Sequence, residues 1–381
     1  MEVDPRRVPN AMKLCVLMPA HWSGRLGGAE IQVRYLLRHL RETSNHQVTV
    51  ICRHASMTED EGATIYRIKT YKPLARYSYL PDYFSVQGLL RQIDPDVVYS
   101  RVGSPLVGFA AHYCKRHRKP LVHHIARLDD VLPRAELPAQ NLTRNLERRI
   151  YEAGLRRADA VIAQAHYQAK LLDKHFNRKT EAVIANYHPA PASAPVKDAR
   201  ERRVVWVANI KRGKRPEAFI ELARRCQDLP NTQFIMVGAI SDKRYVPLIE
   251  QARRLANFRY DGPAPLDDVN RLLDSAHVFV NTSIALGEGF PNSYIQAWLR
   301  GTPVLSLEVD PDSLLADGHM GLCSNNSSDQ LLHNLYSLLG DPTRLKTMAT
   351  FVRDEALRHF GSHNLERIQM LLEQHAVRAA A

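Results

Sequence analysis

Short apolar runs recur along this chain, and most are followed by a polar or glycine-containing loop and an amphipathic segment. The first run covers residues 13–19, and the segment 29–40 after it places Ile31, Leu36 and Leu40 on or near one face of a helix. Short runs without alternation are typical of parallel strands that are buried on both faces. Further runs cover 47–52, 96–100, 121–125, 160–163, 203–208, 234–237, 278–280 and 303–306. This alternation predicts the α/β class, with parallel sheets and helices on both faces.

The same plan occurs in both halves of the chain. In the second half, the run 203–208 leads into a basic loop and a helix through Phe219, with Pro216 in the first helical turn, where proline is favoured. Three prolines within residues 189–195 are typical of a stiff surface linker. We therefore expect a first domain over 1–188, a linker over 189–200, a second domain over 201–362 and a helical segment over 363–381.

The composition is that of an ordinary globular protein, with 45% apolar and 24% charged residues, and 381 residues suffice for two domains that each bury a core. No apolar run reaches the length of a membrane-spanning helix, and residues 1–10 lack the apolar stretch of a signal peptide. Five widely spaced cysteines without a CxxC pair indicate buried free thiols. We therefore expect a cytoplasmic protein.

The positive charge is concentrated in one half of the chain. Of the net charge of +12, residues 1–186 carry +11 and residues 187–381 carry +1. A basic surface attracts anionic membranes, nucleic acids or anionic substrates. No zinc knuckle, RNP run or helix-turn-helix pattern accompanies the charge, so we expect no nucleic-acid partner.

The segment 287–304 carries the most specific signal in the chain. It follows the run 278–280 and places Glu288 between two glycines, before a predicted helix that stops at Gly301. Such a loop brings a carboxylate and backbone N–H groups to a helix N-terminus, where anions are favoured. Gln296 stands eight residues after Glu288. The segment resembles the signature of retaining family-4 glycosyltransferases with the GT-B fold, in which two glutamates are separated by seven residues.

The resemblance implies two Rossmann-like domains that face each other across a cleft, with the last helix, here 365–377, crossing back onto the first domain. It also implies transfer of a hexosyl group from a nucleotide diphosphate sugar to an acceptor hydroxyl, with retention at the anomeric carbon and without a metal ion or other cofactor. In the family, the residue at the place of Glu288 contacts the donor sugar. The residue at the place of Gln296 holds the ribose of the nucleotide, and a glutamine keeps an acceptor oxygen for that diol.

The resemblance assigns further donor contacts to the two glycine-containing loops and to the basic loop. In the family, a cation and then a lysine in the basic loop neutralise the diphosphate and stabilise the leaving group. Gly28 belongs to a Gly-Gly-x-Glu loop that resembles the loop after the family's first strand. The predicted donor-side residues are Lys211, Arg212 and Lys214 of the basic loop, Gly28, and Gly289, Phe290 and Asn292 beside Glu288. A solvated charge run and an ordinary strand-to-helix turn remain the alternatives for the basic loop and for Gly28.

Two regions of the first domain are candidates for the acceptor side. Many relatives carry a histidine after the fifth strand, near the place of Ala126 or Arg127 here, and His124 precedes that place. Arg127, Asp129 and His124 are therefore the predicted acceptor-side residues. Residues 66–84 interleave tyrosines with Lys and Arg, which suits a bilayer headgroup zone and a lipid-linked saccharide acceptor. A solvated loop beside a salt-bridged basic helix, 144–157, is the alternative for this segment.

Two Asp-Pro-Asp sequences, at 94–96 and 310–312, are interpreted as loop punctuation rather than a metal-binding pair. We therefore expect no metal site. The expected role is the synthesis of exopolysaccharide or lipopolysaccharide at the inner face of a membrane. A nucleotide-sugar epimerase and a catalytically inactive scaffold subunit with the same fold remain the alternatives.

Overall fold

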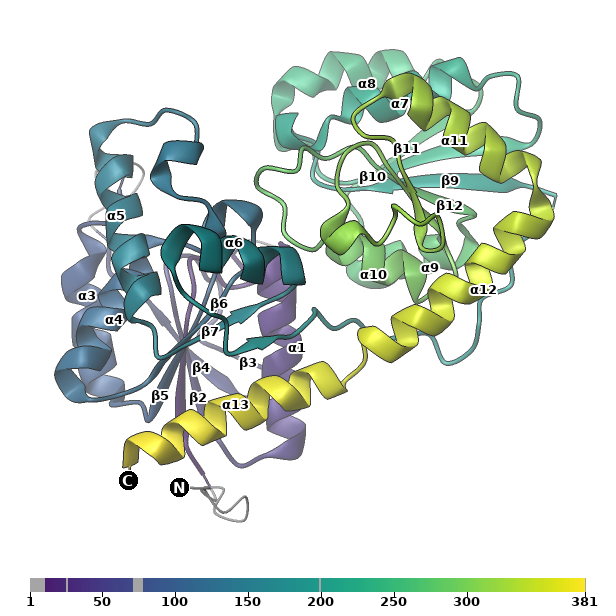
Figure 1. Ribbon diagram of the computed structural model, residues 1–381. Coiled ribbons are helices and arrows are strands. Elements are labelled where there is room, and N and C mark those ends of the chain that lie inside the picture. Colours follow the sequence, from purple (N-terminus) through teal and green to yellow (C-terminus); the bar gives the residue numbers. More distant parts are fainter. Residues whose placement is uncertain (1–10, 25–26, 71–77, 199, 381) are drawn as a thin grey trace. The chain divides into compact units, whose positions relative to one another are not determined.

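The computed structural model describes residues 11–24, 27–70, 78–198 and 200–380. The chain divides into two compact units (Figure 1). The first unit comprises Met1–Tyr187 and Ser362–Ala381, and the second comprises His188–Gly361. Each unit contains a largely or wholly parallel sheet with helices on both of its faces, so the predicted α/β class with two Rossmann-like domains is confirmed.

The sheet of the first unit has eight strands in the order β3-β4-β2-β1-β5-β6-β7-β8. Neighbouring strands are parallel, except for the antiparallel pair β3–β4. The strands are β1 (Lys13–Leu17), β2 (Gln47–Cys52), β3 (Glu59–Asp60), β4 (Ala63–Arg67), β5 (Val97–Arg101), β6 (Leu121–His124), β7 (Ala160–Ala163) and β8 (Ala182–Val183). The carboxyl ends of the parallel strands therefore meet at one edge of this sheet.

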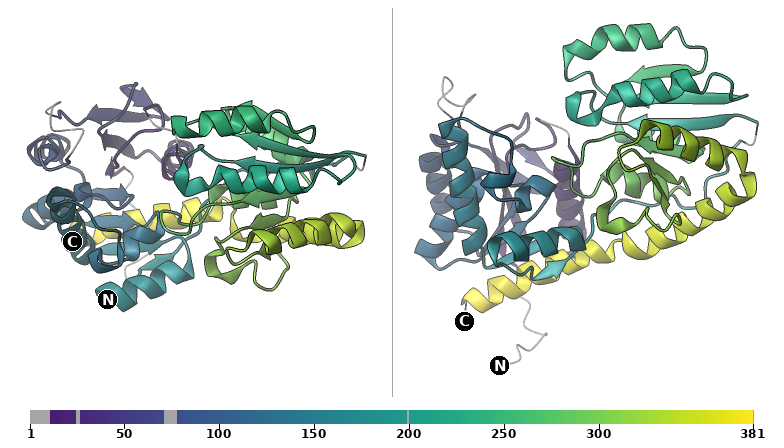
Figure 2. Two further views of the ribbon diagram at one scale, coloured as in Figure 1. Left: turned by 90° about the horizontal axis from the view of Figure 1, so that it is seen from above. Right: turned by 45° about the horizontal axis from the view of Figure 1, so that its top comes forward.

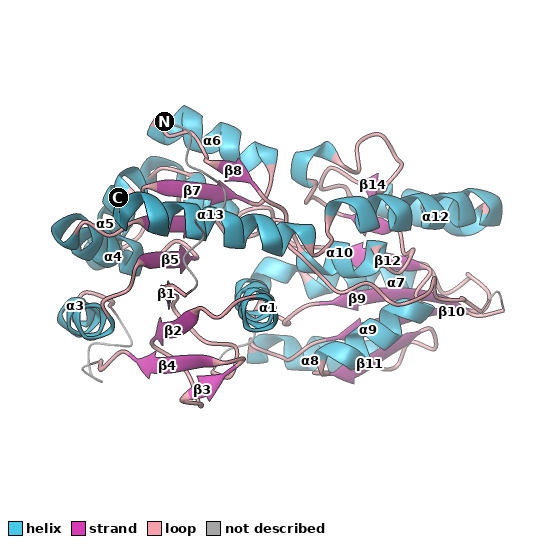
Figure 3. Ribbon diagram, turned by 90° about the horizontal axis from the view of Figure 1, so that it is seen from below, coloured by secondary structure: helices cyan, strands magenta, loops and turns pink. Residues whose placement is uncertain are grey.

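Helices α3, α4 and α5 cover one face of this sheet and α1 lies on the other, whereas α13 runs past the amino ends of the strands (Figure 3). The helices of the unit are α1 (Gly28–Thr43), α3 (Asp82–Ile93), α4 (Pro105–His117), α5 (Leu142–Arg157), α6 (His166–Phe176), α13 (His363–Ala380) and the short 3-10 helices η1 (Leu128–Val131) and η2 (Arg134–Glu136). The final helix packs against α1, and its Glu373 carboxylate contacts the His46 ring at 2.9 Å. This contact brings the last part of the chain into the first unit.

The sheet of the second unit has six parallel strands in the order β11-β10-β9-β12-β13-β14. They are β9 (Arg202–Val207), β10 (Thr232–Val237), β11 (Phe258–Gly262), β12 (Val278–Asn281), β13 (Val304–Ser306) and β14 (Gly321–Cys323). Strands β9 and β12 are neighbours, although about 70 residues separate them in the sequence, because the chain crosses over the sheet between β11 and β12.

Helices α7 and α11 lie on one face of the second sheet, and α9, α10 and α12 lie on the other (Figures 1 and 2). The helices of this unit are α7 (Pro216–Arg225), α8 (Val246–Ala252), α9 (Leu266–Ser275), α10 (Asn292–Trp298), α11 (Ser328–Gly340), α12 (Pro342–His359) and the 3-10 helices η3 (Arg212–Lys214), η4 (Lys243–Tyr245) and η5 (Pro311–Ser313). Trp206, Phe219 and Phe234 are fully buried between α7 and the sheet, as the apolar pattern of these segments requires.

The structure also bears on the expectations for the cysteines, for membrane-spanning helices and for residues 66–84. The five cysteines are free, and four are buried, but Cys323 is half-buried, so the expectation of uniformly buried thiols is wrong at this position. In the described part of the chain, none of the helices is both long and apolar enough to cross a bilayer. Of the tyrosine-rich segment 66–84, residues 71–77 lie outside the described residues. Tyr79 and Tyr83 pack against the core of the first unit, whereas Phe84 is exposed.

Candidate functional site

The basic loop after β9 and the acidic loop after β12 converge in the second unit, because both leave the carboxyl ends of neighbouring parallel strands. The Lys214 ammonium forms an ion pair with the Glu288 carboxylate. The Lys214 side chain is 20% exposed and the Glu288 side chain is 15% exposed, so the pair is largely buried but still reached by solvent. The Ile284 N–H also donates to the Gly213 carbonyl at 2.9 Å and fixes one loop to the other.

The turn that presents Glu288 depends on a glycine. Gly287 has a φ of +89°, a conformation that residues with a Cβ rarely adopt. The N–H of Glu288 donates to the Ala285 carbonyl at 3.1 Å, which closes the turn. The carboxylate therefore projects from a tight turn whose geometry the sequence encodes locally.

The other two cations of the basic loop are exposed. Lys211 precedes η3 and Arg212 is its first residue, and the Lys214 N–H donates to the Lys211 carbonyl at 2.9 Å. The structure therefore brings Lys214 to Glu288 and leaves the side chains of Lys211 and Arg212 at the surface beside them. Their predicted role at a diphosphate stays a prediction.

Arg215 lies beside this pair and was not among the residues predicted from the sequence. Its guanidinium donates to the carbonyls of Thr282 at 2.7 Å and Ser283 at 3.0 Å, and it pairs with the Glu308 carboxylate at 2.7 Å and with Asn326. These partners follow β12, β13 and β14, so one side chain connects the ends of three strands to the loop after β9. Arg215 stands in a run of cations, and nothing in the sequence distinguishes an arginine that binds the strand ends from a solvated one.

Thr282 fixes the backbone of the loop that carries Lys214. Its buried hydroxyl donates to the Lys214 carbonyl at 2.6 Å and accepts from the Trp206 indole at 2.9 Å. The backbone that carries Lys214 is therefore held against the core of the sheet. Because both loops are fixed by buried hydrogen bonds, the ion pair rests on a preorganised support.

The structure limits how two predicted donor contacts could act. The Phe290 ring is buried and lies 6.1 Å from the Trp298 ring and 5.3 Å from the Phe360 ring, centroid to centroid. It is therefore a core side chain, and only the backbone of Phe290 and of the buried Gly289 could meet a ligand. Asn292 begins α10, and its side chain hydrogen bonds to His188. Burial, with a smaller contribution from Arg300, lowers the pKa of His188 to about 3, so this histidine is neutral.

Gln296 lies on the inner side of α10. Its side chain is buried, and its amide donates to the Asn270 side chain on α9 at 3.0 Å. The Arg300 guanidinium donates to the Gln296 carbonyl at 3.1 Å. The glutamine therefore connects α10 to α9, and its predicted contact with a ribose stays a prediction.

The predicted acceptor-side residues lie at the carboxyl end of β6 in the first unit. His124 is buried, and its Nδ1 lies 2.8 Å from the Tyr99 hydroxyl and 3.0 Å from the Arg101 guanidinium. Burial, and then the charge of Arg101, lower the pKa of His124 well below its ordinary value, so the ring is neutral. An acceptor would reach this ring only if the network with Tyr99 and Arg101 opened.

Arg127 and Asp129 are close to each other and more accessible. The Arg127 guanidinium lies 3.2 Å from the Asp129 carboxylate and 3.6 Å from that of the buried Asp130. Burial and the neighbouring Asp130 raise the pKa of Asp129. In the same unit, Gly28 is the exposed first residue of α1, in the loop after β1. These positions are compatible with ligand contact, and their roles stay predictions.

Among the described residues, no group of three or more His, Cys, Asp or Glu side chains is arranged so that it could hold a metal ion. Of the two Asp-Pro-Asp sequences, the first interacts with Lys119, which lies 3.2 Å from Asp94. In the second, Asp310 accepts from the Leu315 N–H at 2.9 Å. Both sequences thus have identifiable structural partners.

Comparison with known proteins connects this geometry to a family. Residues 26–186 match the model of Glycosyltransferase Family 4, and residues 201–341 match the model of Glycosyl transferases group 1. No curated protein sequence matches the chain.

Solved structures resemble the whole chain at low sequence identity. Sucrose-phosphate synthase from Thermosynechococcus elongatus has a TM-score of 0.76 and 17% identity, over 97% of this chain and 100% of its own. Anabaena HepE in complex with UDP and glucose has a TM-score of 0.73 and 18% identity, over 95% of this chain and 100% of its own. WaaG, a glycosyltransferase involved in lipopolysaccharide biosynthesis, has a TM-score of 0.71 and 16% identity, over 94% of this chain and 99% of its own. At these identities the likeness shows the fold.

Proposed function

Because the chain belongs to the family-4-type glycosyltransferases with the GT-B fold, we propose that it transfers a hexosyl group from a nucleotide diphosphate sugar to an acceptor hydroxyl. We further propose that the anomeric configuration is retained and that neither a metal ion nor another cofactor takes part. The observation that carries the proposal is the Lys214–Glu288 pair at the carboxyl ends of β9 and β12. Ligands of open α/β sheets bind at this edge.

The two members of the pair suit different parts of a nucleotide sugar. The Lys214 ammonium, with the exposed Lys211 and Arg212 beside it, would stabilise the negative charge that develops on the leaving diphosphate. The Glu288 carboxylate would accept hydrogen bonds from hydroxyls of the donor sugar. HepE has been solved with UDP and with UDP-glucose, which supports a uridine nucleotide as the first donor to test.

The test is a donor screen followed by product analysis. Thermal unfolding of the protein with a panel of nucleotide sugars should single out one donor, since a ligand that binds the native state raises the melting temperature. Incubation of that donor with candidate acceptors should give a glycoside, and NMR should show the donor's anomeric configuration in the product. Glu288→Gln should abolish transfer and keep the fold. An epimer formed without acceptor would favour the epimerase alternative, and an inverted product would refute retention.

We propose a lipid-linked saccharide acceptor met at an anionic membrane surface on the cytoplasmic side, as part of exopolysaccharide or lipopolysaccharide synthesis. Residues 1–186 carry nearly all of the net positive charge. The exposed large apolar side chains of the first unit include Phe84 on α3 and Leu142 and Leu146 on α5, with exposed fractions of 80%, 85% and 46%. Exposed apolar groups within a basic domain suit the interface of an anionic bilayer.

Vesicle sedimentation tests this part separately. The protein should sediment with vesicles that contain anionic lipid and should dissociate at high salt, because salt screens the attraction. Exchanging Phe84 and Leu142 for serine should weaken sedimentation and leave donor binding unchanged. Val196→Ser, at an exposed position of the second unit, is the control. If the unmodified protein ignores anionic vesicles at low salt, the membrane proposal fails and a soluble acceptor takes its place.

A further inference from the structure

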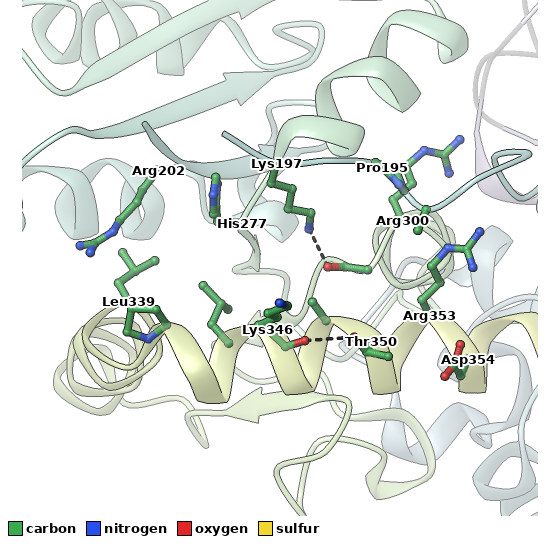
Figure 4. Close-up of a pocket in the computed structure, with 15 residues that line it drawn as sticks. Pro195, Lys197, Arg202, His277, Arg300, Leu339, Lys346, Thr350, Arg353 and Asp354 are labelled. Atoms are coloured by element: carbon green, nitrogen blue, oxygen red, sulfur yellow. Dashed lines mark hydrogen bonds between the residues drawn. The ribbon is translucent and has the colours of Figure 1, made fainter. Parts of the chain in front are cut away.

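A cavity in the second unit lies at the opposite edge of the sheet from Lys214 and Glu288. Arg202 begins β9, His277 precedes β12 and Gly301 lies shortly before β13, so these residues mark the amino ends of the strands. Together with the linker and α12 they surround this cavity of about 500 Å³ (Figure 4). This volume falls within the range of roughly 300–1,000 Å³ that is typical of small-molecule sites.

The wall of the cavity is largely apolar and comes from two segments. The linker contributes Pro195, and the end of α11 and the first turns of α12 contribute Leu339, Pro342, Leu345 and Ala349. In Figure 4, Leu339 and Lys346 lie below Pro195 and Lys197, on the side of the cavity that α12 forms. An apolar body could therefore rest against α12.

One amine stands at the inner end of this apolar wall. The Lys197 ammonium donates to the Gly301 carbonyl at 2.6 Å and to the Thr302 hydroxyl at 2.8 Å, which are both uncharged groups. The carboxylate of Asp274 acts on the pKa of Lys197, but it forms an ion pair with Arg300 at 3.0 Å. Burial lowers the pKa of Lys197 to about 7, because the interior disfavours the charged form of the amine.

The other charged groups around the cavity add to the positive potential. Arg202, Lys346 and Arg353 line it, against the single lining carboxylate of Asp354. Within the described residues, the Nε of Arg353 is buried and has no hydrogen-bond partner. Burial, and then the charge of Lys197, lower the pKa of His277 to about 4, so this ring is neutral. The cavity thus combines an apolar wall with an unmatched excess of cations.

We propose that this cavity binds an amphipathic anion, with its carboxylate on Lys197 and its apolar body against α12. Charge complementarity favours this class over a neutral or cationic apolar ligand, because a buried ammonium gains most from an anionic partner. A carboxylate beside Lys197 would restore its charged form, so binding should take up a proton near and above neutral pH. The proposal concerns a separate edge of the sheet and does not depend on the transfer reaction.

Calorimetry on the full chain with decanoate as the probe tests the proposal. Decanoate should bind with one-to-one stoichiometry at pH 6.5, whereas acetate and decyltrimethylammonium should not bind. Affinity should fall up to tenfold per pH unit above about 7, and titrations in buffers of different protonation enthalpy should report proton uptake. Absence of saturable decanoate binding, or equal binding of the decyl cation, would overturn the proposal.

Variants locate the site. Lys197→Met keeps the length of the side chain and removes its charge, and it should weaken decanoate binding at least tenfold. Arg224→Gln, at an exposed position on α7, should leave the affinity unchanged. Because Lys197→Met could perturb the linker, Ala349→Trp provides a second test, since it fills the cavity and keeps the lysine. Decanoate binding within twofold of the unmodified protein in both folded variants would place the ligand elsewhere and refute the assignment.

Discussion

Replacing Lys214 with alanine should weaken binding of a nucleoside diphosphate much more than binding of the nucleoside with the same base. The Lys214 side chain is 20% exposed, so its charge acts in a medium between water and the protein interior. Two unit charges 4 Å apart attract by about 4 kcal/mol at an effective dielectric constant of 20, which sets an upper limit. Hydrogen bonds to charged groups contribute roughly 1.5–3 kcal/mol net. We therefore expect the diphosphate to bind about 10- to 150-fold more weakly, and the nucleoside to bind unchanged.

The ion pair also predicts that removing the charge of Glu288 has the opposite effect on diphosphate affinity. In the described state Glu288 neutralises Lys214, so a bound diphosphate competes with the carboxylate for the ammonium. Glu288→Gln removes this competing charge and should keep or strengthen diphosphate affinity, by up to about tenfold, an energy of roughly 1.4 kcal/mol. The same change should abolish sugar transfer. Affinity and turnover should therefore move in opposite directions in this variant.

Calorimetric titration with the diphosphate and with the nucleoside measures both effects, and unfolding curves check that the variants are folded. Arg224→Ala, which removes an exposed cation from the same unit, controls for the general loss of positive charge. Equal weakening of both ligands by Lys214→Ala would place the lysine away from the diphosphate. A large loss of diphosphate affinity in Glu288→Gln would show that the carboxylate supports the nucleotide instead of competing with it.

Three further predictions concern stability. Gln296→Glu should cost about 1–3 kcal/mol in urea unfolding, because a buried amide donor is lost and a carboxylate is buried in its place; unchanged stability would contradict the burial. Gly238→Ala should destabilise by roughly 2–4 kcal/mol, since its Cβ would lie 1.8 Å from the Ala208 carbonyl oxygen, whereas Gly213→Ala, with open space around it, should be nearly neutral; equal effects would refute the steric argument. Burial lowers the pKa of Lys197 to about 7, below its value of about 10.4 in the unfolded chain, so the unfolded chain binds more protons between these values and stability should rise with pH there. Unfolding curves of Lys197→Met should lack this contribution, and identical pH slopes in both proteins would contradict it.

Most interior strands were predictable from the sequence, whereas the interior strand β4 and the edge strands were not. β2 and β7 were expected with the bounds that the structure has. β7 is buried throughout and is a continuous apolar run, whereas in β2 only the last three residues are buried. β11 lies at the edge of its sheet, and its sequence Phe-Arg-Tyr-Asp-Gly alternates with exposure, so no apolar run marks it. The two-residue strands β3 and β8 are too short to produce any pattern.

The meeting of Lys214 and Glu288 could be expected only through the family resemblance. Local pattern predicts that each residue follows a strand, but strand order decides whether the two loops are neighbours. β9 pairs with β12 because the chain crosses over after β11, and this crossover leaves no local signal. The sequence also did not show that the side chains of Gln296 and Phe290 point into the protein. Both lie on the buried side of α10 and its preceding loop, and packing against α9 and α12 decides which side is buried.

Two cations at the carboxyl edge of the second sheet are already paired, Lys214 with Glu288 and Arg215 with Glu308, whereas the side chains of Lys211 and Arg212 are exposed. Arg215 donates its hydrogen bonds to residues at the strand ends, which hold it in place. Lys214 instead has a carboxylate partner that a diphosphate could replace. A bound diphosphate would therefore release Glu288 toward the sugar at the same moment that it captures Lys214. In this arrangement the ion pair holds both side chains in place before the donor arrives, which limits the entropy lost on binding.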